Sequence, residues 1–432
     1  MYMHIFFSGI GGSGIGALAL IAKQAGHTVS GSDKQDSEGL SYLKSHGVED
    51  IYVGQTEAAI AALHAKNPID WYVYSSALPK ENPNHPELVF VESQNIKHSK
   101  RDELLNQIIT DKNLKLIAVA GTHGKSTTTA MVIWLFKELG LPISYSIGAK
   151  IGFGDSGQLD PASQYFIYEC DEFDRNFLAF QPYIALISGI AWDHHEIFPS
   201  EENYNDAFKE FLGQSEHRVM WNDDYARLNL ADANYTVVTP TDELYSRLTL
   251  TGEVNRRDAW GAVKTVQWLT SEPLDHLIDV MNEFPGLSRR MEQIKPNLYT
   301  DYAHNPEKIM GAVQTALETA AEKDQKVVVV YEPLTNRRMH YTRLLHKDVF
   351  NGVSALYWVP SYLAREDPAQ AILTPAELIQ DLNQTTKEIA KPMELNDQLK
   401  AVIQSHLDHD DLVIALSGGG GNSLDEWLRK EF

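Results

Sequence analysis

A glycine-rich turn between an apolar run and a helix-like segment is the most informative feature of this chain. Residues 114–119 are mostly apolar, residues 121–127 read GTHGKST, and residues 131–139 have the composition of a helix. Glycines let backbone N–H groups approach phosphate oxygens, and the N-terminus of the next helix adds the positive end of its dipole. This arrangement is typical of a nucleoside triphosphate site, where Lys125 would reach the terminal phosphates and Ser126 would ligate Mg²⁺.

The turn departs from the standard phosphate loop because Val119 stands where that pattern has glycine, so the loop is shorter. A chance GKS in an irregular loop is the alternative, and the strand and helix patterns on both sides argue against it. The residues expected around the triphosphate are Gly121, Thr122, His123, Gly124, Lys125, Ser126 and Thr127.

A second glycine-rich turn lies near the N-terminus. Residues 9–14 read GIGGSG after a short apolar run, and Asp33 lies about twenty residues further on. The pattern is typical of a fold that holds a diphosphate-linked nucleotide, with the carboxylate on a ribose, and it does not by itself indicate a redox cofactor. The residues expected at this site are Gly11, Gly12, Ser13, Gly14 and Asp33, with Ser75 and Ser76 from the loop after a further strand candidate.

Two clusters of metal-binding side-chain types follow apolar runs in the middle of the chain. Residues 169–174 read ECDEFD after the run 165–168, and residues 193–196 read DHHE after the run 184–187. Ligands bind at the carboxyl edge of a parallel sheet, where such segments would lie. Carboxylates suit Mg²⁺ on a triphosphate, whereas histidine with carboxylate also suits zinc, so the residues alone leave both metals open.

The last third of the chain carries further candidates for binding anions. Asp301 and His304 lie in the segment TDYAHNP, which follows a short strand candidate and could reach a ribose or a phosphate. Arg289 and Arg290 precede that strand with two permanent positive charges, which suit phosphate. Arg338 follows the strongest strand candidate of this region and could grip a carboxylate through two hydrogen bonds.

Length and patterning indicate how these groups must be positioned. The chain has 432 residues, more than one hydrophobic core usually serves, so two or three domains are expected. Strand-like and helix-like runs alternate throughout, which predicts an α/β fold with parallel sheets. We expect three such domains, at residues 1–108, 109–284 and 285–432.

Charge and composition exclude several classes of partner. The net charge of −22 argues against a nucleic acid or a membrane surface as partner. Cys170 is the only cysteine, which excludes a disulfide framework and suits a reducing compartment. No basic, apolar leader opens the sequence, and no run approaches the ~20 apolar residues of a membrane helix. We therefore expect a soluble, cytoplasmic protein.

Taken in order, these segments resemble the Mur ligases of bacterial cell-wall synthesis. The matching stretches span nearly the whole chain: GIGGSGIGALAL with VSGSD, YSSALPKENP, AVAGTHGKSTTT, YECDEFD, WDHHEIF, GLSRRME and TDYAHNPEKI. The most specific part is AGTHGKST together with DYAHNP. The resemblance implies a Rossmann-like N-terminal domain for a UDP-sugar, a central phosphate-loop-type domain for ATP and a Rossmann-like C-terminal domain.

The resemblance also implies an ATP-dependent, amide-forming ligase of peptidoglycan precursor synthesis that uses ATP and Mg²⁺. ATP would phosphorylate the lactyl carboxylate of UDP-N-acetylmuramate, and an incoming amine would then attack the acyl phosphate. GIGGSGIG, VSGSD, FLAFQPYIALIS and SSALPKENP favour the branch that adds L-alanine, whereas DHHEIF and EPLTNRR are closer to the branch that adds a murein tripeptide. We expect L-alanine as the acceptor, the tripeptide as the alternative, and a monomer or weak homodimer.

Site roles follow from the resemblance position by position. The residues implied for catalysis are Lys125, Glu169, His194, His304 and Arg338, the last on the carboxylate of the acceptor. Those implied for Mg²⁺, which the resemblance favours over zinc, are Ser126, Glu169 and His194. Those implied for the adenosine part of ATP are Asn255, Arg290 and Asp301.

The sequence departs from the family pattern at several positions. Val254 replaces a histidine, Gly189 and Asp258 replace asparagines, and residues 334–338 and 418–421 differ from the usual motifs. The changes at Val254 and at residues 334–338 keep one alternative open, a nucleotide-binding regulator without catalytic activity. A second alternative, a nicotinamide-dependent dehydrogenase, rests on residues 9–14 and Asp33 and leaves GTHGKST unexplained.

Overall fold

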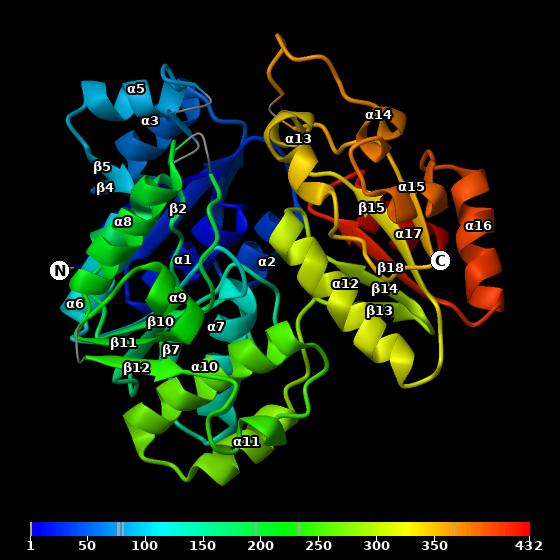
Figure 1. Cartoon of the computed structure of the whole chain (residues 1–432). Helices are drawn as coiled ribbons and strands as arrows, with labels where there is room; N and C mark the ends of the chain where they lie inside the picture. Colours follow the sequence, from blue (N-terminus) through cyan, green and yellow to red (C-terminus); the bar gives the residue numbers. More distant parts are fainter. Residues whose placement is uncertain (1, 76–77, 80–81, 195–196, 232–233, 365) are drawn as a thin grey trace. The chain divides into compact units, whose positions relative to one another are not determined.

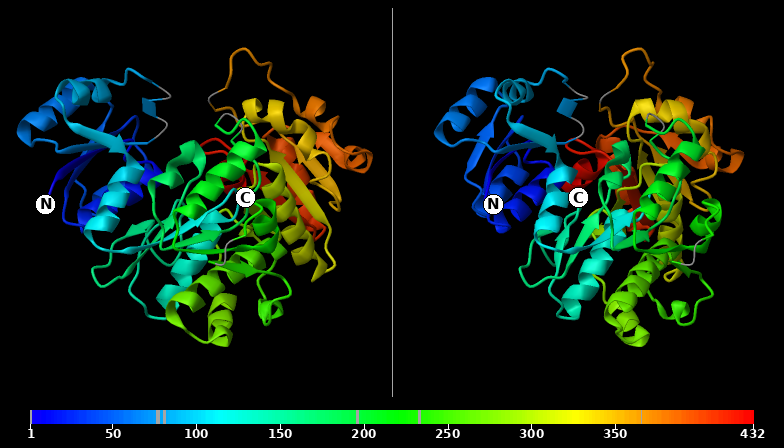
Figure 2. Two further views of the ribbon diagram at one scale, coloured as in Figure 1. Left: turned by 60° about the vertical axis from the view of Figure 1, so that its left-hand side comes forward. Right: turned by 90° about the vertical axis from the view of Figure 1, so that its left-hand side faces the viewer.

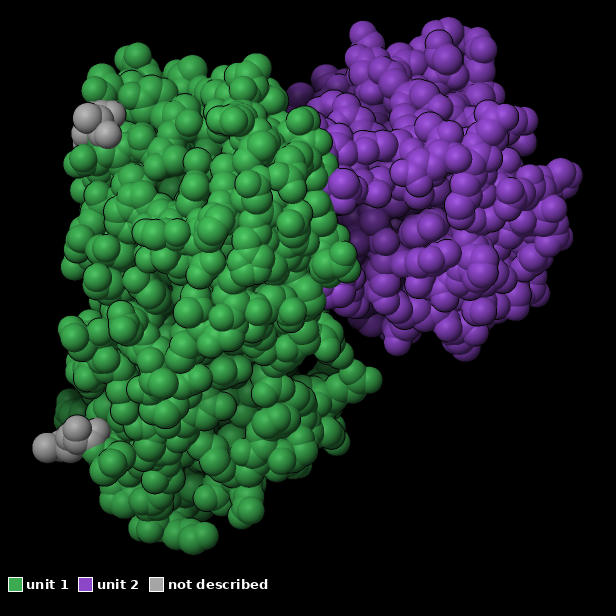
Figure 3. Space-filling view, turned by 90° about the horizontal axis from the view of Figure 1, so that it is seen from below, with its two compact units in different colours: residues 1–248, 258–284 green, residues 249–257, 285–432 purple. Residues whose placement is uncertain are grey.

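The computed structural model of the chain describes residues 2–75, 78–79, 82–194, 197–231, 234–364 and 366–432 (Figure 1). The predicted α/β fold is confirmed: the strands form three sheets of mainly parallel strands. The described residues divide into two compact units, one of residues up to 248 with 258–284 and one of residues 249–257 with 285–432 (Figure 3). The first unit contains two sheets and the second contains one, while the exact domain boundaries stay a prediction.

The first sheet has five parallel strands in the order β3-β2-β1-β4-β5. Its strands are β1 (His4–Ser8), β2 (Thr28–Asp33), β3 (Asp50–Val53), β4 (Trp71–Tyr74) and β5 (Lys97–Lys100). Its described helices are α1 (Ser13–Gln24), α2 (Glu38–Ser45), α3 (Glu57–Lys66), α5 (Pro86–Ser93) and α6 (Arg101–Asp111). The strand order reverses between β1 and β4, so a ligand crevice is expected at the carboxyl ends of these two strands.

The second sheet has the order β12-β11-β10-β6-β9-β7-β8. Its strands are β6 (Lys115–Ala120), β7 (Ser144–Ser146), β8 (Gly157–Gln158), β9 (Tyr165–Glu169), β10 (Ile184–Ile187), β11 (His217–Trp221) and β12 (Tyr235–Val238). Its helices are α7 (Lys125–Glu138), η1 (Phe173–Ala179), α8 (Glu201–Gly213), α9 (Asn222–Arg227), η2 (Tyr245–Arg247), α10 (Glu253–Thr270) and α11 (Leu274–Asn282). Parallel pairing of β6 with β9 and β10 brings the ends of these strands to one edge.

The third sheet has the order β13-β14-β18-β15-β16-β17, in which only β13 and β14 pair antiparallel. Its strands are β13 (Glu292–Lys295), β14 (Leu298–Asp301), β15 (Val327–Glu332), β16 (Ala355–Trp358), β17 (Ala390–Pro392) and β18 (Leu412–Ser417). Its helices are α12 (Pro306–Ala321), α13 (Asn336–Thr342), η3 (Arg343–His346), α14 (Pro375–Ile379), α15 (Gln384–Ile389), α16 (Asp397–Asp408) and α17 (Leu424–Glu431).

Strand β15 shows why the central strands are continuous apolar runs. Val329 and Tyr331 pack in a core that includes residues of α12, whereas Val328 and Val330 pack in a second core with residues of α16 and α17. Helices therefore cover both faces of this sheet, as Figures 1 and 2 show. A strand buried on both faces gains from apolar side chains at every position, which confirms the prediction made from KVVVVY.

No helix among the described residues combines the length and the apolar character that a membrane span requires.

Candidate active site

The turn between β6 and α7 is built so that only glycine fits at two of its positions. Gly121 and Gly124 have φ angles of 148° and 75°. A Cβ atom on Gly121 would lie 2.5 Å from Ser188 Oγ, and one on Gly124 would lie 2.5 Å from a carboxylate oxygen of Asp258. The tight turn leaves the N-terminus of α7 without a capping side chain, which suits a phosphate.

Lys125, the first residue of α7, is held by a buried carboxylate. Its Nζ lies 2.6 Å from Glu172 Oε2 and 2.5 Å from the carbonyl oxygen of Gly121. Burial alone lowers the pKa of Lys125, but the carboxylates of Glu172, Asp171 and Glu169 outweigh it and raise the pKa overall. The ammonium group therefore stays charged beside the turn, where it can bind phosphate oxygens.

Glu172 is the centre of a larger network, and its side chain is only 1 % exposed. Its Oε1 lies 3.7 Å from His194 Nε2 and accepts a hydrogen bond of 3.4 Å from the hydroxyl of Tyr204. The same Tyr204 hydroxyl lies 2.7 Å from the Thr122 hydroxyl. One carboxylate thus joins the segments that follow β6, β9 and β10.

Ser126 and Glu169 form a pair of oxygen ligands at the same edge. The Ser126 hydroxyl donates to Glu169 Oε1 at 2.7 Å, and the backbone N–H of Gly148 donates to Oε2 at 2.7 Å. His194 contacts Glu172 rather than this pair, and its buried Nδ1 has no hydrogen-bond partner among the described residues.

The oxygen atoms of Ser126 and Glu169 are of the type that binds Mg²⁺. Within the described ranges, which omit His195 and Glu196, no three histidine, cysteine or acidic side chains form a metal cluster. Zinc usually requires such a preformed set of ligands, whereas Mg²⁺ typically binds one or two protein oxygens together with substrate phosphates. Ser126 and Glu169 supply such a pair, and the free Nδ1 of His194 offers one further ligand.

The other residues of the turn have structural contacts. Thr122 Oγ1 donates to the carbonyl oxygen of Ala191 at 2.7 Å and accepts from its N–H at 2.9 Å. The His123 ring lies against Gly189, where a Cβ atom would collide with it. Thr127 is buried in α7.

The first glycine-rich turn, between β1 and α1, has the predicted link to Asp33. The N–H of Gly11 donates to Asp33 Oδ2 at 2.8 Å, and no side chain caps the helix after Gly12. A cavity of about 650 Å³ opens on Gly11, Gly12 and Ser13 and on residues 148–151. Among the residues predicted for this site, Ser75 directly follows β4, and Ser76 lies outside the described residues.

A second cavity, of about 480 Å³, lies on the other side of Asp33. It is lined by Lys34, Gln55, Leu78, Asn82, His85 and Pro86. Beneath it, buried Glu87 accepts a hydrogen bond of 2.7 Å from Ser8, whose hydroxyl also accepts one of 2.8 Å from Gln55. Burial raises the pKa of Glu87. The cavity is thus polar and lies at the carboxyl ends of β1 to β4, where ligands of such sheets bind.

In the second unit, three predicted residues gather around Tyr302. The guanidinium of Arg290 lies 5.1 Å from the centre of the Tyr302 ring, and His304 Nδ1 lies 3.2 Å from the Tyr302 carbonyl oxygen. Asp301 ends β14 and accepts a hydrogen bond of 2.9 Å from the N–H of Met291. Burial raises the pKa of Asp301 despite the nearby arginines. The amide of Asn255 donates to the Thr251 carbonyl oxygen at 2.7 Å, within the same unit.

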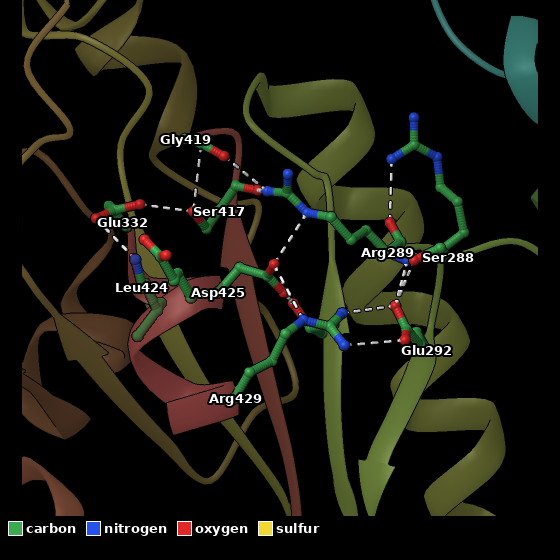
Figure 4. Close-up of polar contacts among 12 residues, drawn as sticks. Ser288, Arg289, Glu292, Glu332, Ser417, Gly419, Leu424, Asp425 and Arg429 are labelled. Atoms are coloured by element: carbon green, nitrogen blue, oxygen red, sulfur yellow. Dashed lines mark hydrogen bonds and ion pairs between the residues drawn. The ribbon is translucent and has the colours of Figure 1, made fainter. Parts of the chain in front are cut away.

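Arg289 has a different task from Arg290. Figure 4 shows its guanidinium donating to the carbonyl oxygens of Ser417 and Gly419, both at 3.0 Å. Its Nε also lies 3.4 Å from Asp425 Oδ2. Arg289 therefore fixes the start of the loop 418–421 to the segment that precedes β13. In that segment, the Arg289 carbonyl oxygen accepts a hydrogen bond from the N–H of Tyr302.

A carboxylate–arginine pair lies next to Arg289. Arg429 donates to Glu292 at 2.7 and 3.1 Å, and the N–H of Arg289 donates to Glu292 at 2.6 Å (Figure 4). The hydrogen bonds from Arg429, above all, lower the pKa of Glu292 to about 2.

Arg338 lies in the first turn of α13, where Thr335 caps the helix. Its NH1 is buried and finds no hydrogen-bond acceptor among the described residues. Buried donors are normally satisfied, so this guanidinium suits a ligand carboxylate. Gly418 packs between His304 and Leu334, and a Cβ atom on Gly418 would lie 2.7 Å from His304 Cβ. Leu334, at the start of the segment 334–338 that contains Arg338, therefore lies close to His304 and the other residues around Tyr302.

Comparison with known proteins now identifies the family. The model of the Mur ligase family, catalytic domain, matches residues 4–113, and the Mur ligase middle domain matches residues 119–253. A UDP-N-acetylmuramate–L-alanine ligase of Thermobifida fusca is 30% identical over 87% of this chain and 86% of its own length. The chain belongs to the Mur ligase family.

Other relatives of this Mur ligase agree with that assignment. A UDP-N-acetylmuramate–L-alanine ligase of Christiangramia forsetii is 28% identical and covers 92% of both chains. Among solved structures, the UDP-N-acetylmuramate-alanine ligase of Thermotoga maritima has a TM-score of 0.74 at 22% identity, over 100% of this chain and 98% of its own. A murein peptide ligase of Psychrobacter arcticus has a TM-score of 0.59 at 20% identity, over 97% and 96%. Both structures show the same fold.

The sequence placed Glu172 only in a general acidic cluster and paired Arg289 with Arg290 for phosphate, and it gave Asp258 no role. Glu172 lies in the acidic cluster 169–174, but nothing in its spacing distinguishes it from its neighbours. Asp258 was noted as a departure from the family pattern, and its carboxylate packs against Gly124. The roles predicted for the other residues remain predictions that the experiments below address.

The pairing of Lys125 with Glu172 predicts strong coupling in stability. Breaking a buried ion pair leaves one charge without a partner, so Glu172→Gln and Lys125→Met should each lower the free energy of unfolding by about 2–4 kcal/mol. The double variant should lose about 1–3 kcal/mol less than the two single losses together. Urea denaturation would measure all three.

The exposed pair Lys209–Asp206, whose atoms lie 3.1 Å apart, is the matched control. Lys209→Met with Asp206→Asn should show a coupling below about 1 kcal/mol. Additive losses at Lys125 and Glu172 would contradict the network described here.

The lowered pKa of Glu292 predicts a pH-dependent contribution to stability. The carboxylate titrates near 2 in the folded chain instead of near 4.5, so its stabilisation is present above pH 4.5 and is lost as pH falls toward 2. Glu292→Gln should cost about 1–2 kcal/mol at pH 7, and less at each step below pH 4.5. Urea denaturation of the wild type and of Glu292→Gln at several pH values from 7 to 3 would measure the difference in their free energies of unfolding. Glu394 is an exposed carboxylate, and Glu394→Gln should leave the free energy of unfolding unchanged. If the loss in Glu292→Gln did not vary with pH, the stabilisation would not come from the ionised Glu292 carboxylate.

Proposed function

We propose that this Mur ligase joins the carboxylate of UDP-N-acetylmuramate to the amino group of L-alanine at the expense of ATP. The observation that carries the proposal is the meeting of Lys125, Ser126, Glu169 and His194 at the ends of three adjacent strands, beside a helix N-terminus. This is an arrangement for phosphoryl transfer, which needs positioning and neutralisation of charge more than covalent catalysis. The names of the relatives support the two substrates.

The proposed reaction solves a chemical problem, because a carboxylate is a poor electrophile. Transfer of the γ-phosphoryl group of ATP to the lactyl carboxylate gives an acyl phosphate and ADP. The amine nitrogen then attacks the acyl carbon, and phosphate leaves with the former carboxylate oxygen. Lys125 would neutralise the terminal phosphates, and Glu172 holds it in place. Mg²⁺, held by Ser126 and Glu169 and at a second position by His194, would supply further neutralisation of the phosphate charge.

The first sheet offers a matching site for the sugar nucleotide. The uncapped start of α1 suits the diphosphate, and Asp33, already oriented by Gly11, suits a ribose hydroxyl. The polar cavity beyond Asp33, lined by Gln55 and His85, has room for the base. In the second unit, Asn255, Arg290 and Asp301 would contact the adenosine part of ATP. Membership of the Mur ligase family argues against the dehydrogenase alternative.

Phosphate release with different acceptors tests the function. With ATP, Mg²⁺ and UDP-N-acetylmuramate, the chain should release phosphate when L-alanine is added, and much more slowly with other amino acids or murein tripeptide. Lys125→Met should lower kcat/KM at least about 100-fold, since it removes a charge-assisted contact to the transferred group. Lys209→Met is the surface control.

The outcomes separate the candidates. If phosphate is released only with murein tripeptide, the acceptor is the tripeptide and not L-alanine. Tight binding of ATP without turnover with any amine would favour the regulator over the ligase.

Arg338 should determine the affinity for the acceptor. Its unsatisfied NH1 suits the α-carboxylate of L-alanine, and lysine cannot reproduce a bidentate grip. Arg338→Lys should therefore raise KM for L-alanine about tenfold or more and leave KM for ATP nearly unchanged, as measured by steady-state phosphate release. The neighbouring Arg337→Lys should change neither value. An unaltered KM for L-alanine in Arg338→Lys would assign the acceptor carboxylate to another residue.

A further inference from the structure

Arg101 lies at the edge of the first sheet that carries the glycine-rich turn. Strand β5 ends at Lys100, and Arg101 is the first residue of α6. Because β1, β4 and β5 run parallel, the segment after β5 emerges at the same edge as residues 9–14. No sequence motif marks this residue.

The guanidinium of Arg101 is oriented by carboxylates on two of its nitrogens. Its Nε lies 3.6 Å from Asp102 Oδ1, and its NH2 lies 3.6 Å from Asp171 Oδ2. Asp102 is itself buried and accepts a hydrogen bond of 2.8 Å from the hydroxyl of Tyr168. The guanidinium plane is therefore held from two sides.

The third nitrogen, NH1, faces the first turn of α1. It lies so close to Gly14 that a Cβ atom on that residue would collide with it. None of the described residues accepts a hydrogen bond from NH1. A side chain at position 14 would therefore displace the guanidinium from this place.

The first turn of α1 lacks the groups that would otherwise satisfy this charge. It contains no acidic residue, and no side chain caps the helix. The NH1 group of Arg101 and the backbone N–H groups in the first turn of α1 therefore lie close together. Such a set of donors suits the doubly charged diphosphate of a nucleotide.

We propose that Arg101 is a binding residue for the diphosphate of the sugar nucleotide, acting together with the N-terminus of α1. This inference rests on the proposed function, which supplies the nucleotide. Through Asp171 the same side chain reaches the acidic segment 169–174 that contains Glu169 and Glu172. Arg101 therefore lies between the two glycine-rich turns and links the diphosphate to the residues around Lys125.

Lys100 provides a matched control at the same edge. Its Nζ pairs with Asp174 of the same acidic segment at 2.6 Å, and no glycine of the turn lies against it. Replacing Lys100 by methionine removes one ion pair between the two sheets but leaves the first turn of α1 unchanged. A purely structural role of Arg101 would give both variants similar effects.

Calorimetry with UDP, and ligand-observed NMR with uridine as a probe without phosphates, test the proposal. The wild-type chain should bind UDP far more tightly than uridine. Arg101→Met should weaken UDP binding about 10–100-fold and leave uridine binding unchanged, with an intermediate loss in Arg101→Lys. Lys100→Met should bind both as the wild type does. Binding of Mg²⁺–ATP should be similar in all variants.

Each outcome decides the question. Unchanged UDP affinity in Arg101→Met, or equal losses for UDP and uridine, would overturn the proposal while leaving the ligase function intact. Failure of the wild-type chain to bind UDP would overturn both. If Arg101→Met does not fold, Arg101→Lys decides alone, because a partial loss confined to UDP supports the proposal and no loss refutes it.

Discussion

The buried carboxylate of Glu172 is the constraint on which the centre of the first unit depends. A charge that is almost entirely removed from water must be paired, and Glu172 is paired with Lys125 while it also contacts His194 and Tyr204. These partners come from segments far apart in the sequence. Their mutual position is therefore fixed by electrostatics before any nucleotide binds, which is the preorganisation that phosphoryl transfer requires.

Parallel strand topology brings these segments together. In the second sheet β6 lies between β9 and β10, so the glycine-rich turn, the acidic segment and the histidine segment leave the sheet side by side. The acidic segment 169–174 contacts two groups of residues. Glu169 and Glu172 contact Ser126 and Lys125 of the glycine-rich turn. Asp171 pairs with Arg101, and Asp174 pairs with Lys100. One short loop thus connects the proposed ATP site to the proposed sugar-nucleotide site.

The second unit shows the same use of a buried network around a glycine-rich loop. Arg289, Asp425 and Glu332 hold the loop after β18, with Ser417 donating to Glu332 at 2.5 Å (Figure 4). Arg290 and Arg338 remain directed at other tasks. Arg289 and Arg290 both lie over the Tyr302 ring, and Arg289 in addition bonds to this loop.

The sequence by itself determined the α/β class, the family, the glycine-rich turns and the buried strands, because these depend on local periodicity and on turns that only glycine permits. It could not distinguish the role of Glu172 from those of its acidic neighbours, or that of Arg289 from that of Arg290, and it could not show that Arg101 differs from an ordinary surface arginine. Each of these roles depends on partners that are distant in the chain. The same holds for the close contacts of Gly14 with Arg101 and of Gly189 with His123. Tertiary structure decided these roles, since charge pairing and close packing act between neighbours in space.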